Sequence, residues 1–269
     1  MRFDFYGSTI RDDPKRVISS LADRLGASVT TSHGMNSYEH SNELRVDREV
    51  VGRVLTGGVN PFPHAFASGQ NTDDFVPVVR ELWPDRHSVS RADVAEDFDQ
   101  DDAWDLLLKE CLAMAEGKRL AIDQQGDWVR GEAGRTFYVG ARKSPSRVRL
   151  YEKGKQMRGL VATPEEAAKV SLGWVRLELQ VRPVKEGKWA AATAAPEELW
   201  GYSGWTKALA VRCLEMDVDR YSNPWREGST DARAWGFMLR QYGPLMLRME
   251  ERLGSWEAVS AAMWGALHA

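Results

Sequence analysis

Cysteine and long apolar runs are both scarce in this sequence, and their scarcity excludes two broad classes of protein. The 269 residues include two cysteines, Cys111 and Cys213, which do not form a Cys-x-x-Cys pair. The disulfide framework of a small secreted protein is therefore excluded, and a reducing cytoplasm is the expected location. No apolar run reaches the roughly 20 residues that a membrane-spanning helix needs. The opening MRFDFYGSTI lacks the apolar segment of a signal peptide, so we expect no membrane association.

Net positive charge is also missing, although charge is distributed unevenly along the chain. The formal net charge is −3, so no overall basic field attracts the protein to nucleic acid. Residues 131–188, however, hold thirteen Lys and Arg against six Asp and Glu. A local basic region of this kind can form a phosphate-binding surface on an acidic protein.

The length allows one large domain or two small ones. Strand-like and helix-like patterns alternate up to Pro183, whereas the remainder is helical and rich in aromatic residues. We therefore expect an α+β fold, with an antiparallel-sheet domain at residues 1–185 and a helical C-terminal segment, 186–269, packed on it. No sequence repeat is visible, but a duplication into two related sheet units could leave no trace in the sequence.

Local signals define the expected elements. Pro14 opens an amphipathic helix that Gly26 ends, and Thr163 with Glu166 forms a capping box at the start of another. The expected helices are 14–25, 72–82, 101–116, 164–172, 207–216, 232–242, 244–253 and 256–267. The expected strands include 28–32, 38–46, 50–55, 88–98 and 174–182.

Residues 136–156, TFYVGARKSPSRVRLYEKGKQ, form two strand-like runs around a turn-like KSPS. The second run places Arg147, Arg149, Tyr151 and Lys153 on one face of a strand, because strand side chains alternate with period two. The apolar residues between them face the other way. A cationic surround stabilises both a phenolate and a phosphate, which a DNA-nicking tyrosine needs. An amphipathic surface strand is the alternative interpretation.

Two other predicted strands carry polar groups on one face. Arg91, Asp93 and Asp97 share a face of the first, and Arg176 and Glu178 share a face of the second. If these strands are neighbours, their carboxylates suit Mg²⁺ or Mn²⁺, which could polarise a phosphodiester. The alternatives are a solvated acidic edge for the aspartates and a salt bridge to an arginine for Glu178.

In their order and spacing, these motifs resemble those of the replication initiation factor family, Rep_trans. The matching positions are Arg91 and Asp93; Gly140 and Ser144; Arg149, Tyr151 and Lys153; and Arg176 and Glu178. The resemblance spans roughly residues 34–254. Members of this family are rolling-circle replication initiators of plasmids and filamentous phages, and related relaxases of integrative elements. The resemblance implies a sheet platform related to that of the HUH nucleases. This chain has no His-x-His pair, so carboxylates would hold the metal.

The resemblance also implies an enzyme that nicks one DNA strand at an origin and becomes linked to its 5′ phosphate through tyrosine. Tyr151 would be the nucleophile, with Lys153 lowering its pKa and Arg149 holding the phosphate. Asp93, Glu178 and, in addition, Asp97 would bind Mg²⁺ or Mn²⁺. The partners expected are origin DNA with a hairpin or single-stranded nick site, a host helicase and, as a candidate assembly, a homodimer.

Further cations and a second tyrosine complete the predicted site. The residues expected to contact DNA are Arg142, Lys143, Arg147, Lys155 and Arg176. Tyr138 competes for the role of nucleophile, but its apolar neighbours favour a core position. Two other functions stay open: an origin-binding protein without catalysis, and a metal-dependent nuclease that uses water.

Overall fold

The computed structural model describes residues 1–219, 238, 243 and 245–268. It divides the chain into two compact units, Met1–Asn223 and Pro224–Ala269. The second unit contains α9 (Trp256–Leu267) and a helical stretch at 245–253. Most of the helix expected at 232–242 lies outside the described residues.

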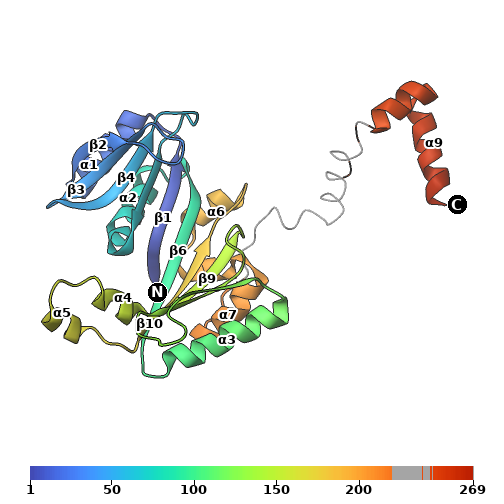
Figure 1. The fold of residues 1–269 in the computed structure, drawn as a ribbon. Helices are drawn as coiled ribbons and strands as arrows, with labels where there is room; N and C mark the ends of the chain where they lie inside the picture. Colours follow the sequence, from blue (N-terminus) through green and yellow to red (C-terminus); the bar gives the residue numbers. More distant parts are fainter. Residues whose placement is uncertain (220–237, 239–242, 244, 269) are drawn as a thin grey trace. The chain divides into compact units, whose positions relative to one another are not determined.

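A ten-stranded antiparallel sheet organises the first unit (Figure 1). Its spatial order is β2-β3-β4-β5-β1-β6-β10-β9-β8-β7. The strands are β1 (Arg2–Ile10), β2 (Ser28–His33), β3 (His40–Val46), β4 (Glu49–Thr56), β5 (His64–Ser68), β6 (His87–Asp99), β7 (Ile122–Gly126), β8 (Arg135–Val139), β9 (Ser146–Tyr151) and β10 (Trp174–Val181). The prediction of an α+β fold on an antiparallel sheet is confirmed.

The strand order shows that the sheet consists of two halves with the same topology. Each half begins with a strand at the centre of the sheet, β1 or β6, and crosses by a helix to the outer edge. From there, four strands return to the centre one by one. The starting strands β1 and β6 pair with each other and join the halves (Figure 1). The structure therefore contains the two related sheet units that the sequence could only suggest.

Helices connect these strands, and several begin where the sequence predicts. Asp13 caps the first helix by accepting a hydrogen bond from the Arg16 backbone, and Gly26 ends it with a φ of 61°. The helices are α1 (Pro14–Leu25), α2 (Thr72–Leu82), α3 (Ala103–Lys118), α4 (Lys153–Arg158), α5 (Pro164–Lys169), α6 (Gly187–Thr193) and α7 (Gly204–Leu214), with 3-10 helices η1 (Gly69–Asn71) and η2 (Glu197–Tyr202). Helix α6 contacts β6, and α7 contacts α3, so both belong to the first unit rather than to a segment beginning at 186.

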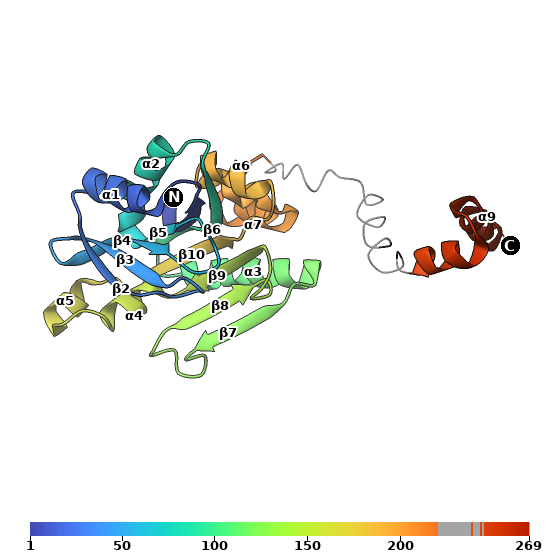
Figure 2. The ribbon, with the colours of Figure 1, turned by 90° about the horizontal axis from the view of Figure 1, so that it is seen from above.

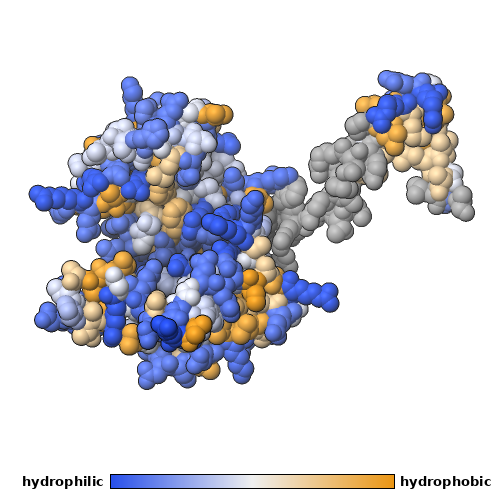
Figure 3. Space-filling view, viewed as in Figure 1, coloured by the Kyte–Doolittle hydropathy of each residue, from blue (hydrophilic) through white to orange (hydrophobic). Residues whose placement is uncertain are grey.

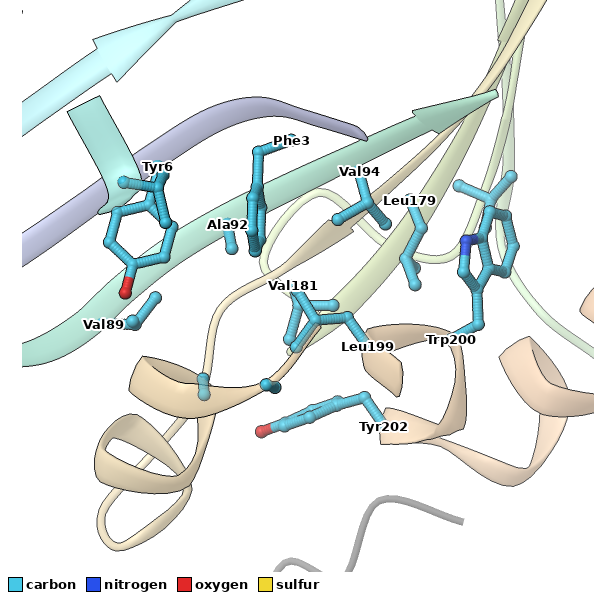
Figure 4. Close-up of a cluster of buried hydrophobic side chains, with 14 of the residues drawn as sticks. Phe3, Tyr6, Val89, Ala92, Val94, Leu179, Val181, Leu199, Trp200 and Tyr202 are labelled. Atoms are coloured by element: carbon cyan, nitrogen blue, oxygen red, sulfur yellow. The ribbon is translucent and has the colours of Figure 1, made fainter. Parts of the chain in front are cut away.

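The hydrophobic core lies on one face of the sheet. Helices α1 and α2 lie along one side of β3, β4 and β5 (Figure 2). Near the centre, side chains of β1, β6 and β10 pack against Leu199 and Trp200 of η2 (Figure 4). Burying each large apolar side chain contributes about 1.5–3 kcal/mol relative to leaving it exposed. Because the apolar side chains pack on one face, the opposite face of the sheet can carry charged groups. It is called the polar face below.

Hydrophilic residues cover much of the surface seen in the space-filling view (Figure 3). Within the described ranges, no helix is both long enough and apolar enough to cross a membrane.

Candidate functional site

Strand register brings most of the predicted site residues together on the polar face. Tyr151 of β9 pairs with Arg176 of β10, and Arg176 pairs in turn with Asp97 of β6. Two residues further along β10, Glu178 pairs with Arg149 of β9. Directly paired residues on antiparallel strands project from the same face. The polar face therefore holds a tyrosine, two arginines and two carboxylates within three adjacent strands.

Asp93 of β6 extends this group toward the centre of the sheet. It pairs with Gln180 of β10 on one side and with Phe5 of β1 on the other. Arg91 Nε donates to Asp93 Oδ1 at 2.9 Å, and Gln180 Nε2 donates to Asp93 Oδ2 at 3.4 Å. Asp93 is 2% exposed, so these contacts hold a charged group in a nearly dry position.

Asp4 of β1 also belongs to the site, although sequence reasoning missed it. Arg176 Nη1 donates to Asp4 Oδ1 at 2.7 Å, while its Nε and Nη2 donate to the two oxygens of Asp97 at 2.7 Å each. The one sequence signal for Asp4 is an acidic residue inside an otherwise apolar strand, FDFYG. Its partner lies 172 positions away in the sequence, so the contact depends on the strand order.

Arg176 differs from the DNA-contacting residue that we expected. Its side chain is buried, and its hydrogen bonds go to Asp4 and Asp97. Burial opposes ionisation of Asp97, but hydrogen bonds from Arg176 and Trp174 outweigh it and hold the pKa of Asp97 below its ordinary value. This geometry gives Arg176 a positioning role and places Asp97 in an ion pair with it.

In the part of the chain that the structure describes, Asp93 and Glu178 are the carboxyl groups whose pKa is raised. Burial, together with repulsion from Asp93, raises the pKa of Glu178 to about 7. Burial also raises the pKa of Asp93, against the opposing hydrogen bond from Arg91. Arg149 Nη1 lies 3.9 Å from Glu178 Oε2, a long ion pair that leaves the carboxylate only partly compensated. A second cation near this pair would stabilise the ionised form of both groups.

These two carboxylates are suited to Mg²⁺ or Mn²⁺ because both ions prefer oxygen ligands. Among the described residues, no three His, Cys, Asp or Glu side chains lie close enough together to hold a metal ion by themselves. Mg²⁺ in phosphate-processing sites commonly takes one or two carboxylates, with waters and phosphate oxygens completing its coordination. Asp93 and Glu178 fit such a partial ligand set.

Tyr151 lies beside the carboxylates and is 3% exposed. The Arg149 guanidinium carbon is 3.9 Å from the centroid of its ring, and Lys153 Nζ is 5.7 Å from it. Burial and the nearby Glu178 raise the pKa of Tyr151 above its ordinary value, and Arg176 and Arg149 do not outweigh them. Arg176 and Arg149 do lower this pKa, as expected of cations, but burial has the larger effect, and the net shift is upward.

Lys153 does not lie where the sequence places it. Strand β9 ends at Tyr151, and Lys153 begins helix α4, so it does not continue the strand alternation that the sequence suggests. Its Nζ donates to Gln156 Oε1 at 3.2 Å. Burial lowers the pKa of Lys153, and the positive charge of Arg176 lowers it further.

Tyr138 lies on the polar face, so its predicted core position is wrong. It pairs with Arg149 across β8 and β9, and its half-buried ring lies 3.8 Å from the guanidinium carbon of Arg147. Its neighbours Phe137 and Val139 enter the core instead. Apolar residues on both sides of Tyr138 thus reflect strand alternation and do not indicate burial of the tyrosine itself.

The hairpin cations have different surroundings. Arg142 and Lys143 are exposed in the turn between β8 and β9. Arg147 Nη2 donates to Asp123 Oδ2 of β7 at 3.1 Å. Lys155 Nζ donates to Glu152 Oε1 at 2.8 Å, so it is engaged inside the protein. The two turn residues are the most accessible of the five predicted DNA contacts.

The raised pKa of Glu178 predicts a pH-dependent cost to stability. In the folded protein its carboxyl retains a proton up to pH near 7, whereas in the unfolded chain it ionises near 4.5. Stability associated with this group is therefore present below pH 4.5 and is lost as pH rises through 7. We expect Glu178→Gln to be more stable than the parent at pH 8 by up to about 3 kcal/mol.

Urea unfolding at pH 4.5 and pH 8 without divalent metal measures this effect. The difference between variant and parent should be small at pH 4.5 and large at pH 8. Glu116→Gln, at an exposed position of α3, is the matched control and should show no such pH dependence. A Glu178→Gln variant that is less stable at pH 8 would contradict the assigned ionisation.

Comparison with known proteins places this geometry in a wider context. A model of the family described as replication initiation factor matches residues 87–258. A solved structure described as the rolling circle replication initiator protein from Geobacillus stearothermophilus superimposes with a TM-score of 0.52 at 18% sequence identity. The alignment covers 78% of this chain and 83% of that chain, which shows a shared fold. A search of curated proteins finds no match.

Proposed function

Since this chain belongs to the replication initiation factor family, we propose that it initiates rolling-circle replication, or acts as a related relaxase, by nicking one DNA strand through Tyr151. One observation carries the proposal. On the polar face, Tyr151 lies on β9, and two buried carboxyl groups of raised pKa, Glu178 and Asp93, lie on the next two strands, β10 and β6. Such perturbed groups beside a nucleophile are typical of catalytic sites.

In the proposed step, the Tyr151 hydroxyl passes its proton to solvent water and its oxygen attacks the scissile phosphorus. The bond from phosphorus to the 3′ oxygen breaks, and that oxygen gains a proton to become a 3′ hydroxyl. The DNA then remains attached to the protein as a 5′-phosphotyrosine diester. One diester replaces another, so the step can run backwards and rejoin the ends.

Each neighbouring side chain has a part in this step. Arg149 lies against the Tyr151 ring and its side chain is 31% exposed, so its guanidinium could donate to a phosphate oxygen. Asp93 and Glu178 would hold Mg²⁺ or Mn²⁺, and that ion would supply charge stabilisation at the phosphate. Arg176, which pairs with Tyr151 across β10 and β9, fixes Asp4 and Asp97 through its ion pairs.

Attachment of the protein to DNA tests the proposal directly. Negatively supercoiled plasmid carrying the DNA that flanks the gene is incubated with the protein and Mn²⁺, then analysed on a denaturing gel. The proposal expects open-circular DNA that carries covalently bound protein. Intact plasmid at all metal concentrations would refute it. The predicted helicase partner and homodimer are not tested by this assay and stay predictions.

A metal-dependent nuclease that uses water is the second candidate, and one observation favours it. The raised pKa of Tyr151 makes its hydroxyl a poor nucleophile at neutral pH unless bound DNA or metal changes its surroundings. This candidate predicts nicked DNA with a free 5′ phosphate and no attached protein. The same denaturing gel therefore separates the two.

The exposed turn of the hairpin leads to a prediction about DNA affinity. The triple variant Arg142→Gln, Lys143→Gln and Arg147→Gln is expected to bind DNA more weakly across all sequences. Each phosphate contact that is lost removes about one unit from the slope of log K against log salt. Binding of a duplex measured from 50 to 200 mM salt gives this slope.

The control replaces cations that lie away from the polar face. Lys109→Gln and Lys118→Gln on α3 should leave both the affinity and the salt slope unchanged. If the triple variant also keeps the parental slope, the hairpin does not contact the phosphate backbone.

A further inference from the structure

Four aromatic rings form a row across the first half of the sheet. The row consists of Phe5 on β1, Phe66 and His64 on β5, and Tyr38 shortly before β3. Consecutive ring centroids are 5.7, 6.0 and 6.3 Å apart, and consecutive rings are inclined by 26°, 32° and 25°. Two of these pairs are stacked, Phe5 with Phe66 and Tyr38 with His64, while His64 and Phe66 are tilted, and all four side chains are half-buried. Each is held in place without being enclosed.

Strand register places Phe5, Phe66 and His64 on the polar face, and Tyr38 stacks against His64. Phe5 pairs with Asp93, so the row begins next to a proposed metal ligand. Gly7 pairs with Phe66 and separates Phe5 from the position opposite His64. A Cβ atom at Gly7 would lie 3.0 Å from Phe5 Cε1 and 3.2 Å from His64 Nε2. Glycine thus allows both rings to lie over the strand, where a larger side chain would displace them.

An arginine lies on each side of the row. The Arg91 guanidinium carbon lies 4.5 Å from the Phe5 ring centroid, between the row and Asp93. Arg53 of β4 pairs with Phe66 and lies on the outer side of the row. Burial, assisted by the charge of Lys188, lowers the pKa of His64 to about 4, so its imidazole is neutral at pH 7. The row therefore consists of uncharged rings with an arginine on each side, Arg91 ion-paired with Asp93 and Arg53 ion-paired with Glu43.

We propose that Phe5, Phe66, His64 and Tyr38 form a stacking platform for the bases of single-stranded DNA that leads to the nick site. The inference rests on the proposed function, because the platform ends at Asp93. Half-buried aromatic rings suit nucleobases, since every base presents a π face, and guanidinium groups beside them suit the phosphates between bases. These rings precede residue 87, so they lie outside the part of the chain that matches the family.

Phe66 gives the sharpest test because it occupies the middle of the row. Phe66→Leu keeps an apolar side chain but removes the flat ring, whereas Phe66→Tyr keeps the ring. The probe is a fluorescein-labelled oligothymidine of about 12 nucleotides, a length within the site sizes of single-strand-binding folds. We expect Phe66→Leu to raise its Kd by about 5- to 50-fold and Phe66→Tyr to leave it within about twofold.

Two controls separate stacking from unfolding and from charge. Leu106→Ala removes an exposed apolar side chain from α3 and should bind the probe as the parent does. An oligonucleotide of the same length with abasic sugars at every position keeps the phosphates but lacks bases. It should bind parent and Phe66→Leu equally. Equal Kd values of parent and Phe66→Leu for oligothymidine would overturn the inference. So would a Kd for the abasic strand that Phe66→Leu raises by the same factor as its Kd for oligothymidine.

The readout also separates this inference from the proposed nicking activity. Oligothymidine binding needs no cleavage, so it is measured with EDTA present. If the parent forms no covalent adduct and Phe66→Leu still weakens binding, the platform stands and the nicking proposal fails. If the parent forms adducts and Phe66→Leu binds oligothymidine with the parental Kd, the platform inference fails while the nicking proposal stands.

Discussion

Tyr151→Phe is expected to abolish the covalent protein–DNA adduct, with at least about a 10³-fold loss in the rate of nicking. The substitution removes only the attacking oxygen, while the ring and its contact with Arg149 remain. DNA affinity should stay within about twofold of the parent, because strand and hairpin contacts are unchanged. The measurement is the fraction of labelled DNA that migrates with the mass of the protein on a denaturing gel.

Tyr138→Phe is the matched control for this experiment. Tyr138 lies on the same polar face and is also adjacent to arginines, so it is the residue that could replace Tyr151 as nucleophile. We expect its phenylalanine variant to retain the adduct. An adduct that persists in Tyr151→Phe and disappears in Tyr138→Phe would reassign the nucleophile to β8.

Loss of metal-dependent nicking is the second large effect, expected on the order of 10²-fold or more for Glu178→Gln and for Asp93→Asn. Both substitutions keep the shape of the side chain but remove a charged oxygen ligand. Mn²⁺ binding followed by electron paramagnetic resonance should weaken in parallel. Because Glu178→Gln is expected to be more stable than the parent at pH 8, its loss of activity would not reflect unfolding.

The same ionisation determines how metal binding responds to pH. Glu178 must lose its proton to become a ligand, and its pKa is about 7. Mn²⁺ affinity should therefore increase from pH 6 to pH 8 in the parent. In Glu178→Gln this increase should be absent, and Glu116→Gln should behave as the parent does. A parent whose Mn²⁺ affinity is independent of pH would remove Glu178 from the ligand set.

Local patterns predicted the elements well because their causes are local. Helix α1 begins and ends at its predicted residues because Asp13 caps it and Gly26 adopts the left-handed conformation. Alternation in β10 correctly separated the buried Leu177 and Leu179 from the polar Glu178 side. Such signals depend on near neighbours in the chain and are visible without the fold.

Residues determined by distant contacts were harder to predict. Asp4 joins the site only because β1 lies beside β6. Opposite Gly7 and Ser8, the register skips Ser90 of β6, and this irregularity changes which β6 side chains share a face. The pKa of Tyr151 depends on burial by the assembled sheet, which charge counting along β9 could not include.

Pairing of β1 with β6 also governs how the site can form as the chain is made. β1 is synthesised first, but its partner β6 follows only after the whole first half, and Arg176 reaches Asp4 across 172 positions. Contacts of such high sequence separation form late and slowly, because a long loop must close before they stabilise the fold. We therefore expect the polar face to be completed only after β10 has emerged from the ribosome. A truncated chain that ends before Trp174 would contain the tyrosine without its Glu178 or Arg176, and it would be unable to cut DNA.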